Sequence, residues 1–116
     1  MIADDFRKLA LSLDGAEERS HMQHPDFRVN GKIFATLGYP DEGWAMVKLT
    51  PEQQEMFMKL APTTFAPVKG SWGTKGATNV NLKKARKTIV KEALVVAHRN
   101  LGKGSSKREA RSPKRR

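Results

Sequence analysis

The chain has 116 residues, enough for one modest hydrophobic core and too few for two ordinary domains. It contains no cysteine, which excludes disulfides and thiolate metal sites, and its net charge at pH 7 is +10. The residues up to position 68 hold 7 Lys and Arg against 10 Asp and Glu, whereas the residues from position 69 onward hold 15 against 2. This asymmetry favours a polyanionic partner, nucleic acid before acidic lipid, because clustered cations gain by releasing counterions from phosphates.

The amino terminus does not have the pattern of a signal peptide. Asp4 and Asp5 stand where a signal peptide needs basic residues, and no apolar run in the chain reaches membrane-spanning length. We therefore expect a cytoplasmic protein without a membrane association. The first predicted element is a helix, since apolar residues recur at helical spacing at Phe6, Leu9, Ala10 and Leu13, and Gly15 is expected to end it.

Residues 16–23 are polar and alternate poorly, yet they favour the start of a sheet, and residues 21–49 predict a three-strand meander. Asn30 and Gly31 both tolerate positive φ and lie between two strand-like runs, which predicts a type I′ turn. The register of that turn pairs three sets of residues: Val29 with Lys32, Phe27 with Phe34, and Arg28 with Ile33.

A short helix is predicted after the meander. Thr50 is a capping residue, Pro51 suits the first helical position, and Gln53 completes a capping box. Its predicted core-facing residues are Met56, Phe57 and Leu60. Pro62 ends this helix, and residues 63–68 are expected to form a strand or an extended segment.

Residues 69–78 contain three glycines and a tryptophan, a composition that favours a flexible wing. Residues 79–82 are either a last strand or the entry to a final helix, with Asn81 as a cap. Residues 83–101 have a helical apolar stripe that consists of Ala85, Ile89, Ala93, Val96 and Ala97, widened by Val90, Leu94 and Leu101. The basic stretch 102–116 has no apolar periodicity, and we expect it to be a disordered tail.

Several motifs together resemble the bacterial MmcQ/YjbR family. They are Gly15-Ala16-Glu17-Glu18, the run from His24 to Ala35, the run from Lys48 to Gln53, Trp72-Gly73 and the closing Ala-rich helix. The resemblance implies an α+β domain over residues 1–101, in which an antiparallel sheet is backed by helices at both ends of the chain in a frataxin-like topology. It also implies a DNA-binding role with a double-wing arrangement.

We expect the chain to be a DNA-binding module of low sequence specificity that binds phosphates through its basic C-terminal half. Lys83, Lys84, Lys87 and Lys91 are predicted to share one exposed helical arc, while Trp72 either stacks on a base or fills the core. The full set of candidate binding residues is Lys69, Trp72, Lys75, Lys83, Lys84, Arg86, Lys87, Lys91, Lys107, Arg108, Arg111, Lys114, Arg115 and Arg116. The alternative is a protein-interaction or regulatory adaptor with a solubilising basic tail.

No catalytic, metal or cofactor site is predicted. His21, His24 and Asp26 have donor atoms that a metal could use, but their spacing fits no zinc signature and favours surface or turn positions for the two histidines. The serines lack a nucleophile elbow, and the glycine-rich segment lacks the Walker spacing. His98 has no Cys, His or acid nearby in the sequence, and we expect it to have a structural role.

Overall fold

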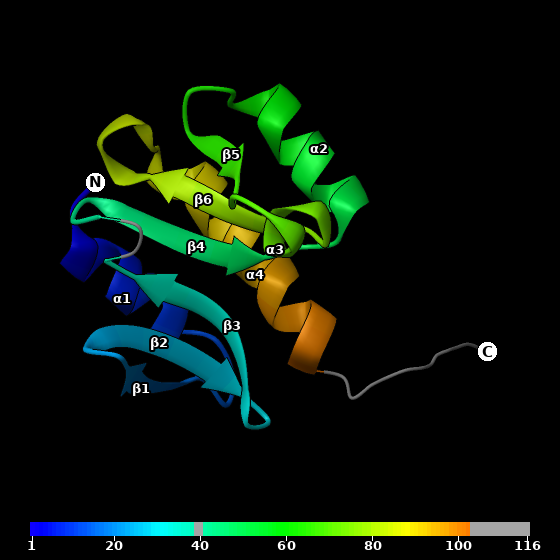
Figure 1. Cartoon of the computed structure of the whole chain (residues 1–116). Helices are drawn as coiled ribbons and strands as arrows, with labels where there is room; N and C mark the ends of the chain where they lie inside the picture. Colours follow the sequence, from blue (N-terminus) through cyan, green and yellow to red (C-terminus); the bar gives the residue numbers. More distant parts are fainter. Residues whose placement is uncertain (39–40, 103–116) are drawn as a thin grey trace.

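An antiparallel sheet of six strands organises this α+β fold (Figure 1). The structure is a computed structural model, and it describes residues 1–38 and 41–102. In chain order the elements are α1 (Ala3–Leu11), β1 (Glu17–His21), β2 (His24–Val29), β3 (Lys32–Leu37), β4 (Trp44–Lys48), α2 (Pro51–Leu60), β5 (Phe65–Pro67), α3 (Ser71–Thr74), β6 (Ala77–Asn81), the 3₁₀ turn η1 (Leu82–Lys84) and α4 (Lys87–Gly102). Helices therefore stand at both ends of the described chain.

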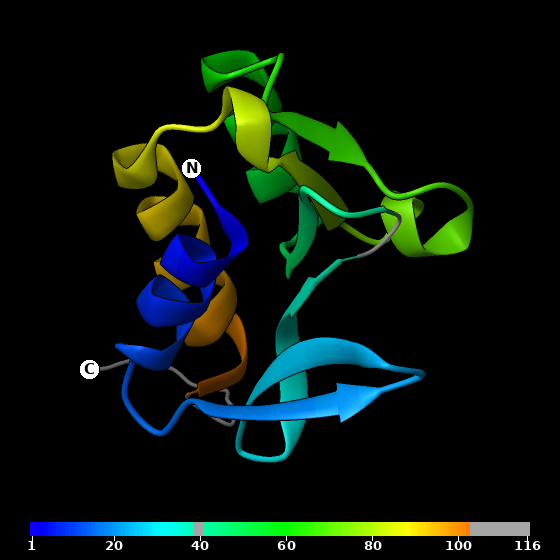
Figure 2. The same cartoon turned by 90° about the vertical axis from the view of Figure 1, so that its left-hand side faces the viewer.

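The strand order is β1-β2-β3-β4-β6-β5, so that β6 lies between β4 and β5. Helices α1 and α4 cover one face of the sheet, and the opposite face, which we call the open face, bears the short helix α3 beside β6 (Figure 2). Alternation along β4 sends Ala45 and Val47 into the core, while Trp44, Met46 and Lys48 lie on the open face. The sheet thus has one face in the core and one face that the long helices leave uncovered.

The core is built from aromatic residues that join the helices to the sheet. The Phe6 ring of α1 lies 6.1 Å from that of Phe27, centroid to centroid. Between α2 and β5, the rings of Phe57 and Phe65 lie 5.4 Å apart, centroid to centroid. His98 packs edge-on against Phe34 and forms a 2.6 Å hydrogen bond through Nε2 with the Asp14 carbonyl oxygen, a structural role as expected.

The predicted meander is confirmed, and residues 17–21 do start the sheet as β1. Asn30 and Gly31 have φ values of 54° and 78°, as a type I′ turn requires. The pairing of Phe27 with Phe34 is wrong, because Phe27 lies opposite Ala35. A β-bulge at this point adds one residue to β3 and keeps both phenylalanines in the core.

The capping box of α2 is confirmed by reciprocal hydrogen bonds between Thr50 and Gln53. Phe57 faces the core as predicted, but Met56 and Leu60 are exposed. The stripe that packs against β5 and β6 is rotated toward Gln54 and Phe57, since Gln54 hydrogen-bonds to Gly73 of α3 and to Ala77 and Thr78 of β6. A polar side chain thus takes a place that the apolar pattern assigned to Met or Leu.

The remaining elements differ from the sequence predictions at their ends. Helix α1 ends at Leu11, before Gly15, and Ala77–Asn81 is a strand. Asn81 does act as a cap, but it caps η1 by accepting a hydrogen bond from the Lys83 backbone N–H. Helix α4 begins at Lys87, so Lys83 and Lys84 are not on its arc. The predicted disordered tail lies, apart from Gly102, outside the described residues.

In the part of the chain that the structure describes, no helix has the length and apolar character needed to cross a membrane.

Candidate functional site

A groove runs across the open face of the sheet, between the β1–β2 hairpin and α3. Both segments project away from the helical layer (Figure 2), and the hollow between them has a volume of about 430 Å³. We call this hollow the open-face groove. It is lined by His21, Met22, His24, Thr36, Met46, Val68, Lys69, Trp72 and Ala77. Apolar and aromatic side chains form most of this surface, with Lys69 and two histidines among them.

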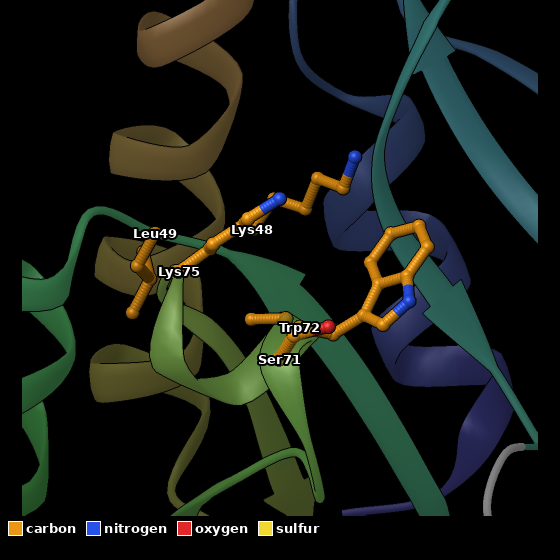
Figure 3. A pocket seen from close by; sticks show the side chains of 6 residues that line it. Lys48, Leu49, Ser71, Trp72 and Lys75 are labelled. Atoms are coloured by element: carbon orange, nitrogen blue, oxygen red, sulfur yellow. The ribbon is translucent and has the colours of Figure 1, made fainter.

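Trp72 stands at the border of this groove with 61% of its surface exposed. It also lines a second hollow of about 330 Å³, together with Lys48, Leu49, Ser71, Lys75 and Ala77. Figure 3 shows the Lys48 and Lys75 side chains extending to the side of α3 on which the indole lies. The Lys48 ammonium is 5.3 Å from the ring centroid, within the range of a cation–π contact. Trp72 is therefore a surface residue and not part of the core.

The segment that carries Trp72 is held firmly against the sheet. Gly73 and Gly76 are buried, and a Cβ on either would overlap a backbone carbonyl oxygen, that of Val68 or of Leu49 respectively. From α2, the side-chain amide of Gln54 donates hydrogen bonds to three oxygens: the carbonyls of Gly73 and Ala77 and the hydroxyl of Thr78. The prediction of a flexible wing over residues 69–78 is wrong in its local structure, because this segment holds α3 and the start of β6, and Gly73 and Gly76 permit its close packing.

A charged network on β1 and β2 contacts His21, one of the residues that line the groove. Asp26 is fully buried and accepts hydrogen bonds from Arg28, at 2.8 Å from Nε and 3.2 Å from Nη2. Its other contact is with His21 Nδ1, at 2.7 Å. The Arg28 hydrogen bond lowers the pKa of Asp26 against the opposing effect of burial, and His21 lowers it further. The same contact with Asp26 raises the pKa of Arg28.

This network fixes the orientation of His21. Because Nδ1 is engaged by the buried carboxylate, Nε2 is the ring nitrogen that remains for a ligand in the groove. The turn that follows has positive φ at Met22 and Gln23, 49° and 68°, where side chains usually cost about 1–2 kcal/mol. Met22 is 86% exposed at this tip, so each lip of the groove presents a large apolar residue to solvent.

The structure divides the candidate binding residues between the two sides of the sheet. Lys69, Trp72 and Lys75 gather around α3 beside the open-face groove. A second group lies at η1 and the start of α4, within the helical layer, and consists of Lys83, Lys84, Arg86, Lys87 and Lys91. Lys87 of this group pairs with Asp5 at 3.8 Å. The candidates Lys107, Arg108, Arg111, Lys114, Arg115 and Arg116 lie outside the described residues.

Sequence reasoning did not select Lys48, Met22 or Met46 for the site. It considered His21 and Asp26 only as metal donors and missed the ion pair of Asp26 with Arg28 that supports His21. The alternation of Trp44, Met46 and Lys48 on β4 was a signal for a second sheet face, but nothing local connected it with Trp72. Among residues 1–38 and 41–102, no cluster of three or more His, Asp or Glu side chains could hold a metal ion.

Fold and groove together define a class: a small α+β protein whose open sheet face presents an aromatic residue beside lysines. The profile of the YjbR family matches residues 11–100, and the chain therefore belongs to this family.

Among solved structures, the chain is similar to the crystal structure of the Deinococcus radiodurans protein DR2400, which is described by the domain name DUF419. The two superimpose with a TM-score of 0.73 over 91% of this chain and 83% of the other, at 20% sequence identity. At this identity the likeness concerns the fold. A comparison with curated proteins gave no match.

Proposed function

We propose that this protein is a nucleic-acid-binding module of low sequence specificity, and that the open-face groove and the adjoining lysines are its contact surface. The observation that carries the proposal is the exposed Trp72, held rigidly on α3 with Lys48, Lys69 and Lys75 around it. Lysines bind phosphates without regard to sequence, and an aromatic face accepts any base. The excess of Lys and Arg after position 68 adds a field that draws a polyanion to the molecule.

The two projecting segments give this surface a shape suited to a strand of nucleic acid. The β1–β2 hairpin and α3 flank the groove, so a chain lying between them meets Met22 on one side and Trp72 on the other. Arg28 and Lys48 lie on the same open face, by strand alternation. A polyanion that follows the groove would therefore meet Lys48 on β4, Lys69 just before α3 and Lys75 just after it.

The test is a salt titration that compares two triple variants. We expect Lys48, Lys69 and Lys75 changed to Gln to lower the slope of log affinity against log salt by roughly 2–3 units, at about 0.9 per phosphate on duplex and 0.7 on single strands. The matched control changes Lys83, Lys84 and Lys91 to Gln. It removes the same charge from the helical side, and it spares Lys87, which is paired with Asp5.

The control variant should change the slope by less than about 1 unit, through the general field of the protein. Equal effects of the two triple variants would refute the open face as the contact surface. A larger effect of the control would place the contact on the helical side instead. Failure of the folded parent to bind duplex, single-stranded DNA or RNA at low salt would refute nucleic-acid binding.

One observation favours a second candidate function, a protein-interaction module. Met56 and Leu60 are one helical turn apart on α2 and are 47% and 61% exposed. Such a pair is the kind of anchor that an apolar surface of another protein recognises. Changing both to Gln should abolish binding to a protein partner and leave the salt slope on nucleic acid unchanged.

A further inference from the structure

We propose that the open-face groove holds one unpaired base of a single-stranded nucleic acid, stacked on Trp72, while Lys48, Lys69 and Lys75 contact the phosphates on either side of it. This inference rests on the proposed function and specifies its ligand. It follows from three features of the site: the rigid mounting of the indole, its place between a basic and an apolar hollow, and a hydrogen-bonding group on the opposite wall.

Because the backbone that carries Trp72 is closely packed, less conformational entropy is lost when a ligand binds to the indole. The backbone around Trp72 is fixed by the close contacts of Gly73 and Gly76 and by the three hydrogen bonds of Gln54. An indole has two rotatable bonds, and Lys48 restricts it further by its cation–π contact. A large aromatic surface that is exposed and yet already positioned is a typical anchor for a ligand.

The indole separates two hollows of different chemistry. One hollow has Lys48, Ser71 and Lys75 together with Leu49, and the other, the open-face groove, has Met22, Met46 and Val68 as its apolar part, with Lys69 at its border with Trp72. A nucleotide has the matching division, because its base is flat and largely apolar on its faces and its phosphate is an anion. The volume of the groove, about 430 Å³, is within the range of small-molecule sites.

His21 gives the groove a group that can meet the edge of a base. Its Nδ1 is engaged by Asp26, which Arg28 holds in turn, so the ring is oriented before any ligand arrives. Thr36 lies on the floor of the same groove. One histidine and one threonine can accept several different bases, which agrees with low sequence specificity.

A base that is stacked within a duplex cannot occupy this groove unless it is flipped out, which costs a few kcal/mol. Single-stranded nucleic acid offers the base without that cost. The same indole would add little to duplex binding, where the lysines alone meet phosphates. We therefore expect single strands to be preferred over duplex at equal salt.

The experiment uses the full chain in a Trp44→Phe background, so that the intrinsic fluorescence comes from Trp72. The probes are an oligothymidylate of about 12 nucleotides, an abasic strand of the same length and charge, and a duplex of equal length. The base-bearing strand should quench the Trp72 emission and bind roughly 5- to 150-fold more tightly than the abasic one, the equivalent of about 1–3 kcal/mol per stacked base.

Trp72→Ala should bring the two single strands to equal affinity without changing the salt slope, and Trp72→Phe should restore part of the difference. Since the side chain is exposed, both variants should unfold near the parent's denaturation midpoint. An oligouridylate in a parallel titration tells whether RNA is bound as well as DNA.

If the parent binds both single strands equally with a normal salt dependence, the stacking inference is overturned and the proposed function stands. Tighter binding of duplex than of the oligothymidylate, unaffected by Trp72→Ala, also overturns it. Absence of binding to any probe at low salt refutes the proposed function itself.

Discussion

Replacing Gly73 with alanine should destabilise the protein through a single steric conflict. A Cβ at this position would overlap the carbonyl oxygen of Val68 and lie 2.8 Å from its carbonyl carbon. Both atoms belong to the backbone and cannot turn aside as a side chain could. Because Gly73 does not have positive φ, the cost is steric and not conformational. We expect a loss of about 3 kcal/mol, the upper end of what overpacking usually costs.

The measurement is urea unfolding followed by far-ultraviolet circular dichroism. In a domain of about 100 residues, each kcal/mol of destabilisation also lowers the melting temperature by roughly 4–8 °C. The control is Gly31→Ala, where φ is +78° and no atom lies within 4 Å of the added Cβ. That variant has only the conformational cost, about 1–2 kcal/mol.

The Gly73 variant should also displace the backbone of α3 that carries Trp72, whereas the Gly31 variant should not. In the Trp44→Phe background, the emission of Trp72 should therefore change with Gly73→Ala alone. A Gly73→Ala protein whose unfolding free energy lies within about 0.5 kcal/mol of the parent would refute the close packing of α3 against Val68.

Three other predictions concern the supports of the site. Folding lowers the pKa of Asp26, so the stabilisation of the fold by its ionised carboxylate is complete above about pH 4 and is lost as the pH falls through the lower pKa of the folded state. The free energy of unfolding, measured from pH 2 to 6, should therefore depend less on pH in Asp26→Asn than in the parent. Arg28→Ala should cost about 3 kcal/mol, because it leaves a buried carboxylate with His21 as its partner, and a loss below 1 kcal/mol in denaturant titration would contradict that ion pair. Asn30→Ala combined with Gly31→Val should destabilise the hairpin, since both positions have positive φ, and an unchanged unfolding midpoint would show that the turn is misassigned.

The predictions from sequence that held rest on signals confined to a few neighbouring residues. The type I′ turn depends on two residues that accept positive φ, and the start of α2 depends on Thr50, Pro51 and Gln53. In both cases the deciding hydrogen bonds or steric limits lie within about four positions along the chain. Family membership was likewise visible in short runs, and the profile match over residues 11–100 confirms it.

The predictions that failed concern positions where distant parts of the chain compete. Met56 and Leu60 fit the apolar pattern of a buried helix, but α2 turns Gln54 inward, where its side-chain amide donates hydrogen bonds to the carbonyl oxygens of Gly73 in α3 and Ala77 in β6. The glycines of residues 70–76 indicated mobility, whereas Gly73 and Gly76 permit close approach to chain segments that sequence alone did not place nearby.

By itself, the sequence determined the α+β class, the meander with its Asn30-Gly31 turn, the helix at Thr50 and the concentration of positive charge after position 68. The tertiary structure decided the composition of the candidate site. Because β6 pairs with β4, the segment that carries Trp72 is brought beside Lys48, and the open face then places His21 and Met22 across the groove. Strand order depends on the packing of the whole core, so no local pattern could have revealed which lysines share a face with the indole.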